Sequence, residues 1–168
     1  NTKVKDGWAQ TFPPGPYLYQ ALTGTNYAIE GGTTGGGAFR SMYTRFLLEA
    51  QQILGNESLG DIAAQYHGIA SMWTALANAI LPDSIPLFKE YKELVRQRDH
   101  AFLSEGIGAA SKESRISSRL LGNEYQAANE FPLNDNETAD LLADVRDHIF
   151  RIYVEESKAI TALKQAVP

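Results

Sequence analysis

The sequence of 168 residues contains no cysteine, so the chain has no disulfide, no thiolate zinc site and no thiol nucleophile of its own. It also contains no apolar run close to the roughly 20 residues that are needed to span a bilayer. No stretch alternates between apolar and polar residues with a period of two, and no βαβ spacing occurs. These absences predict an all-α protein with no membrane partner and no cysteine chemistry.

The composition is that of a soluble globular protein, with 43% hydrophobic and 21% charged residues. A net charge of -5 argues against non-specific binding to nucleic acid, which requires clustered Lys and Arg. Basic residues do gather over residues 89–119, but acidic residues are interleaved with them, as on a solvated helix surface. We therefore expect no nucleic-acid partner, and the absence of cysteine makes a cytoplasmic location the default expectation.

The distribution of glycine and proline divides the chain near residue 35. Residues 1–35 are rich in Gly, Pro and Thr, and the FPPGP sequence at 12–16 excludes a helix there, although a short helix over 17–22 is compatible with the pattern. We interpret this part as a Gly/Pro-rich lead-in segment, with a linker to an N-terminal domain outside this chain as one interpretation. Since the first residue is Asn rather than Met, we expect the chain to be a fragment or a processed form.

Residues 36–168 show helical periodicity and predict a bundle of four to five helices. Gly55 is a typical helix end, Pro86 suits a first turn, and Asn134 with Glu137 has the spacing of a capping box. Ser58 with Asp61, three residues further on, is a second predicted capping box. The first helix is expected to bury one apolar face, made up of Phe39, Met42, Tyr43, Phe46, Leu47, Ala50, Ile53 and Leu54.

The glycine-rich stretch GGTTGGG at 31–37 runs directly into the first of these helices and places Arg40 in its first turn. Glycines at a helix start let backbone N–H groups converge on an anion, and a first-turn cation is mildly unfavourable without an anionic partner. The stretch lacks a P-loop lysine and a preceding strand. Two interpretations stay open: an anion site that includes Gly35, Gly36, Gly37 and Arg40, or an ordinary loop whose Arg40 pairs with a carboxylate on another helix.

Two carboxylates fall close to predicted apolar faces of helices. Glu124 lies on the fourth predicted helix, at about 108–129, and Glu156 lies on the last. A carboxylate buried without a partner costs several kcal/mol, so each is expected to have a partner, lie at a bundle end or line a polar cavity. Arg40 and Arg98 are the available cations. Tyr43 is one of several tyrosines that fit either the core or the wall of a small-molecule site, and the others are Tyr66, Tyr91, Tyr125 and Tyr153, together with Trp73.

Metal and hydrolase chemistry have little support in the sequence. The histidines at 67, 100 and 148 are not preceded by a glutamate at the spacing of di-iron bundles, and the chain has no G-x-S-x-G motif. We therefore expect no metal, no cofactor and no catalytic residue.

The segment GGGAFRSMYTRFLLEA resembles the pattern G-G-x-F-R-x-x-Y-x-x-F-L-x-E-A of a poorly characterised domain. That domain follows the N-terminal domain of butirosin-biosynthesis-protein-H-like proteins. The resemblance extends from about residue 35 to residue 80. The matching positions are Gly36, Gly37, Phe39, Arg40, Tyr43, Phe46, Leu47, Glu49 and Ala50, followed by Trp73, Leu76 and Ala77.

This resemblance implies a protein of two parts. The N-terminal part of that family resembles a papain- or transglutaminase-like cysteine acyltransferase, which moves an acyl group from a carrier-protein thioester to an amine. The present chain would then be a helical accessory part that helps to bind the substrate or the carrier protein, with the N-terminal domain and an acyl carrier protein as partners. The alternative is an interaction or dimerisation module that touches no substrate, with a second copy of the chain as partner.

Overall fold

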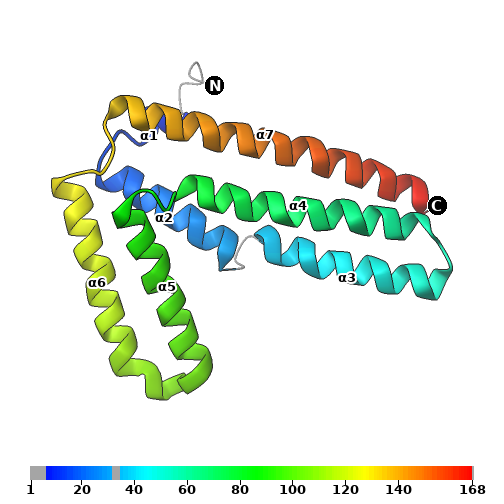
Figure 1. The fold of residues 1–168 in the computed structure, drawn as a ribbon, viewed down its shortest axis with the longest axis horizontal. Coiled ribbons are helices and arrows are strands. Elements are labelled where there is room, and N and C mark those ends of the chain that lie inside the picture. The colour runs from blue at the N-terminus through cyan, green and yellow to red at the C-terminus, as the bar shows by residue number, and fades with distance from the viewer. Residues whose placement is uncertain (1–6, 32–34, 168) are drawn as a thin grey trace. The chain divides into compact units, whose positions relative to one another are not determined.

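The computed structural model describes residues 7–31 and 35–167, and every regular element within them is helical (Figure 1). The all-α prediction is therefore confirmed. The elements are α1 (Trp8–Thr11), α2 (Pro16–Glu30), α3 (Gly36–Leu54), α4 (Ser58–Ile80), α5 (Pro86–Glu105), the 3-10 helix η1 (Gly106–Ala109), α6 (Ala110–Asn129) and α7 (Asp135–Ala166).

The chain divides into two compact units that each draw on separate stretches of sequence. The first unit comprises residues 1–24 and 81–142, and the second comprises residues 25–80 and 143–168. Helices α2 and α7 therefore contribute residues to both units. The candidate site described below lies wholly within the second unit.

The N-terminal segment contains a longer helix than its composition suggests. Helix α2 begins at Pro16 and continues to Glu30, well beyond the short helix expected over 17–22. Proline suits the first position of a helix because its missing N–H is not needed there. Leu18 and Leu22 of this helix are fully buried, so tertiary burial stabilises a segment with modest helix propensity.

Several predicted helix ends are confirmed. Gly55 ends α3 with φ 64°, a left-handed conformation that glycine adopts without strain. At the start of α7, the Glu137 carboxylate accepts from Asn134 N at 2.9 Å, and Asn134 Oδ1 accepts from Glu137 N at 3.0 Å. This reciprocal pair is the predicted capping box.

The capping box predicted at Ser58 is wrong, because Asn56 provides the cap instead. Asn56 Oδ1 accepts a hydrogen bond from the backbone N–H of Ser58 at 3.1 Å. The amide nitrogen of the same side chain donates to the backbone oxygen of Ala166 at 2.9 Å. One loop side chain therefore serves the start of α4 and the last turn of α7.

In the second unit, α3 and α4 run antiparallel, and the later part of α7 completes the helical layer around their core (Figure 1). Asn26 on α2 donates from its side chain to the backbone oxygen of Ala77 at 2.8 Å, which ties α2 to α4. The buried cluster at the centre draws on α3, α4 and α7, and its members are Leu47, Leu59, Ile62, Ala63, Tyr66, Ile69 and Ala159.

The predicted inner face of α3 is wrong in large part. Of its large apolar side chains only Leu47 is buried, whereas Phe39, Met42 and Phe46 are each more than half exposed. The reason is that α3 packs mainly on α4, so a strip of its apolar residues extends past the contact. Other aromatic residues expected in the core are also exposed, namely Tyr125 and Tyr153.

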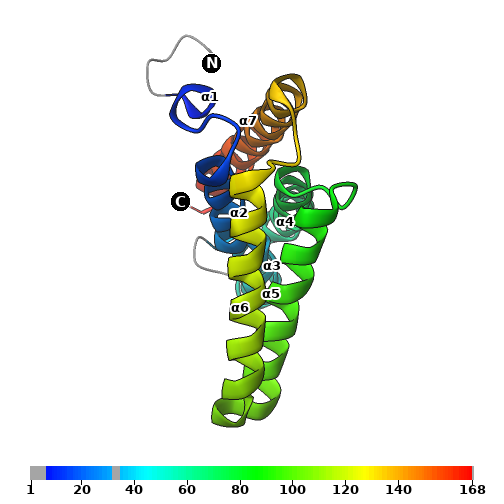
Figure 2. The ribbon, with the colours of Figure 1, turned by 90° about the vertical axis from the view of Figure 1, so that its left-hand side faces the viewer.

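In the first unit, α5 and α6 form an antiparallel hairpin (Figure 2). The buried residues of α6 are Asn123 and Ala127. Asn123 lies near the hydroxyl of Tyr19, which is 1% exposed, but neither Tyr19 Oη nor Asn123 Nδ2 makes a geometrically satisfactory hydrogen bond with a described residue. Burial raises the pKa of Tyr19, and the nearby Tyr91 adds to the effect.

Replacing Tyr19 with phenylalanine should stabilise the protein by about 1 kcal/mol at neutral pH, because a buried hydroxyl without a good partner is removed. Because the pKa of the Tyr19 phenol is raised in the folded protein, the unfolded chain loses this proton first, above pH about 10. The wild type should therefore lose stability as the pH rises beyond about 10, and the variant should not show this loss. Urea unfolding at pH about 7 and above pH about 10 measures the difference. Tyr17→Phe, at a position 70% exposed on the same helix, should change neither value.

Candidate functional site

The glycines at the start of α3 allow a close approach between helices. A Cβ atom on Gly36 would lie 2.3 Å from the backbone oxygen of Ile29, and one on Gly37 would lie 3.0 Å from the backbone oxygen of Ala70. Gly35 has φ +81°, which favours glycine. The described part of the glycine run therefore has a structural reason, whereas its residues 32–34 lie outside the described residues.

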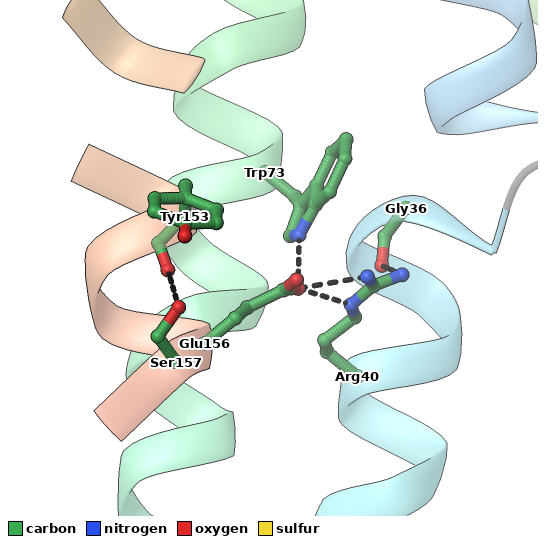
Figure 3. Close-up of polar contacts among 6 residues, drawn as sticks. All are labelled: Gly36, Arg40, Trp73, Tyr153, Glu156 and Ser157. Carbon is green, nitrogen blue, oxygen red and sulfur yellow. Dashed lines mark hydrogen bonds and ion pairs between the residues drawn. The ribbon is translucent and has the colours of Figure 1, made fainter. Parts of the chain in front are cut away.

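One turn into α3, Arg40 forms an ion pair with Glu156 of α7 (Figure 3). Its Nε donates to Glu156 Oε1 at 2.8 Å, and its Nη2 lies 2.7 Å from the same oxygen. Both side chains are 23% exposed. The expectation that Arg40 pairs with a carboxylate from another helix is confirmed, and the carboxylate is one of the two singled out from the sequence.

Trp73 of α4 completes the cluster. Its indole Nε1 donates to Glu156 Oε1 at 3.0 Å (Figure 3), and the Arg40 guanidinium lies 4.7 Å from the centre of the Trp73 ring system. Guanidinium–indole contacts of this kind are attractive because the cation meets the negative face of the ring. Three helices are thus joined at a single carboxylate oxygen.

A groove of about 690 Å³ opens beside this cluster on the second unit. This volume falls within the range of about 300–1,000 Å³ that is typical of small-molecule sites. Among the residues that the structure describes, the charged ones that line the groove are Arg40 and Glu156, and their charges cancel. Its lining residues come from α3, α4 and α7: Phe39, Arg40, Met42, Tyr43, Phe46, Tyr66, Glu156 and Ile160.

Two tyrosines are among the residues that line the groove. The rings of Tyr43 and Tyr66 meet edge to face, with centroids 4.7 Å apart. Burial raises the pKa of Tyr66, and the neighbouring Tyr43 and Glu156 raise it further. Tyr66 therefore remains a neutral phenol at physiological pH, able both to donate and to accept a hydrogen bond.

The candidate residues named from the sequence do not all come together. Arg40, Tyr43 and Glu156 line one groove, while Gly36 and Gly37 set the start of α3 just before it. Glu124 belongs to the first unit, where Gln20 Nε2 donates to its carboxylate at 3.5 Å.

Sequence reasoning missed the roles of Trp73 and Ile160. The sequence leaves Trp73 between the core and the wall of a small-molecule site, and it does not single out Ile160. The indole N–H, which needs an acceptor when it is buried, was the available signal for Trp73.

Other polar clusters show no catalytic arrangement in the described residues. A second hollow of about 450 Å³ is lined in part by Ser41, His67 and Ser71, but Ser71 Oγ donates to the backbone oxygen of His67 rather than to its ring. Within residues 7–31 and 35–167, no group of three or more potential metal ligands is present. No helix in the same part of the chain is long and apolar enough to cross a membrane.

Comparison with protein families matches a domain of unknown function, DUF4872, over residues 6–105. No curated protein and no solved structure matches the chain. The matched region contains α1 to α5 and therefore Arg40, Tyr43 and Trp73, whereas Glu156 lies beyond it. The match covers more than half of the sequence, so the chain belongs to the DUF4872 family.

Proposed function

We propose that this chain is the helical, non-catalytic part of an acyl-transferring protein similar to the butirosin-biosynthesis-protein-H-like proteins, and that its groove holds the acyl group of the donor substrate. The observation that carries the proposal is the groove itself, a mainly apolar site of small-molecule size in which Arg40 and Glu156 form an ion pair with each other. Because the chain has no cysteine, the reactive thiol belongs to a different part of the protein.

The residues of the sequence resemblance support this assignment by their location. Four of its positions line the groove, namely Phe39, Arg40, Tyr43 and Phe46. Two others, Gly36 and Gly37, allow the close approach that sets the start of α3. A pattern shared for the sake of folding alone would be expected to favour core positions, yet Phe39 and Phe46 are 51% and 57% exposed.

The lining of the groove favours the acyl group over a carrier phosphate. A phosphate needs an uncompensated cation or a set of converging N–H groups, and Arg40 is already neutralised by Glu156. Aromatic and aliphatic side chains such as Met42 and Ile160 instead favour an apolar chain or ring, through burial of its surface.

A second candidate function is an interaction module without substrate contact. The observation in its favour is that α3 and α7 expose further large apolar side chains outside the groove. Ile53 is 82% exposed, Leu54 is 66% exposed and Phe150 is 65% exposed. Surface of this kind favours a protein partner, such as the catalytic part or a second copy.

The test is acyl transfer by the longer protein in which this chain accompanies a cysteine-containing domain. Phe46→Ala should raise the KM for the acyl donor about tenfold and leave kcat nearly unchanged, since the uniform binding energy from one aromatic side chain that covers the acyl group is lost. Ile53→Ala, on the same helix but outside the groove, is the matched control and should leave KM unchanged. Equal effects of the two substitutions, or none from either, would instead support the interaction module.

A further inference from the structure

The two oxygens of the Glu156 carboxylate have different surroundings. Oε1 is the acceptor for Arg40 Nε and Trp73 Nε1, and it also lies closest to Arg40 Nη2. Oε2 accepts no hydrogen bond from any described residue, although Glu156 lines the groove. The Glu156 side chain is 23% exposed, so a ligand in the groove that displaces water from Oε2 has to supply a hydrogen-bond donor in its place.

The charge of the site limits which donors are suitable. Arg40 and Glu156 neutralise each other, and the remaining lining residues are uncharged. An anionic ligand would place its charge beside Oε2, and a cationic ligand would lose its hydration in an apolar groove next to the Arg40 guanidinium. An uncharged donor, such as a hydroxyl or an amide N–H, avoids both costs.

We infer that the groove selects an uncharged ligand that has an apolar body and one hydrogen-bond donor, and that Glu156 determines this specificity by accepting the donor at Oε2. Tyr43 and Tyr66 also line the groove, and a phenol hydroxyl can both donate and accept a hydrogen bond. This inference rests on the proposed function only in requiring that the groove binds a small molecule, and it adds the chemical class of that molecule.

The experiment uses four probes with the same eight-carbon chain: 1-octanol, octyl methyl ether, octanoate and octylammonium. Binding to the full chain is followed by the fluorescence of Trp73, which contacts Glu156, in a Trp8→Phe background that removes the only other tryptophan. 1-Octanol should bind about tenfold more tightly than the ether, because only the alcohol donates a hydrogen bond to the carboxylate. Both ions should bind more weakly than 1-octanol.

Two variants link this preference to the site. Glu156→Gln should remove most of the difference between alcohol and ether, and it should increase the affinity for octanoate about tenfold because Arg40 loses its counter-charge. Phe46→Ala should weaken all four probes together, whereas Ile53→Ala should change none. Circular dichroism of each variant verifies that the helices remain folded.

The inference and the proposed function fail on different results. Equal affinities for 1-octanol and its ether, or tightest binding of either ion, would overturn the inference while the groove remains a binding site. Absence of binding by all four probes would overturn the inference too, and the proposed function is contradicted separately if Phe46→Ala leaves acyl transfer unchanged. An octanol preference that persists in Glu156→Gln would show that another residue accepts the hydrogen bond.

Discussion

Replacing Gly36 with alanine should destabilise the protein by about 3 kcal/mol, the largest loss that we expect from adding a single methyl group. The added Cβ would lie 2.3 Å from the backbone oxygen of Ile29, and a backbone atom cannot move aside as a flexible side chain can. The start of α3 would therefore have to shift, and with it the position of Arg40. Urea unfolding monitored by circular dichroism measures the loss.

Gly68 provides a matched control for this substitution. It lies inside α4, and a Cβ atom built on it has no neighbour within 4 Å. Gly68→Ala should stabilise the protein by about 0.5–1 kcal/mol through helix propensity alone. If both substitutions stabilise the protein, the close approach of α3 to Ile29 is contradicted.

The second large effect concerns the ion pair that joins α3 to α7. The Arg40 side chain is 23% exposed. Glu156→Ala should therefore cost about 2 kcal/mol, because it removes the counter-charge of the Arg40 guanidinium and the acceptor of the Trp73 N–H. Arg40→Ala should cost a similar amount. The double variant should cost less than the sum of the two, with a coupling energy of about 1–2 kcal/mol.

The pair of Arg96 and Glu93 on α5 is a suitable comparison, because its side chains are 75% and 48% exposed. The same double-mutant cycle there should give a coupling energy of about 0.5 kcal/mol or less, since water screens exposed pairs. Additive effects of Arg40→Ala and Glu156→Ala, within about 0.3 kcal/mol, would contradict a structural role for the pair.

Local features of the fold are readable from the sequence because they depend on neighbouring residues. Gly55 and the Asn134–Glu137 capping box act within one helical turn, and both are where the pattern places them. Helix α2 was harder to predict, since its buried residues stabilise it through contacts that composition does not reveal. The same limit explains why Phe39 and Phe46 were expected in the core, because periodicity identifies an apolar face but not the area of that face that a neighbour covers.

For the candidate site, the sequence predicts which residues need a partner but not which residues meet. Arg40 needs an anionic partner and Glu156 needs a cationic one, and both needs follow from position within a helix. That the two residues meet, across 116 positions of sequence, depends on how α3 and α7 pack in the second unit. The open oxygen of Glu156, on which ligand selection is proposed to depend, is visible only in the three-dimensional arrangement.

The hydrogen bond from Asn56 to Ala166 has a practical consequence for any shortened or fused version of this protein. A chain that stops before Ala166 loses the carbonyl to which the loop between α3 and α4 is anchored. Tags and fusion partners are therefore best attached beyond that carbonyl, so that the final turn keeps its lateral support.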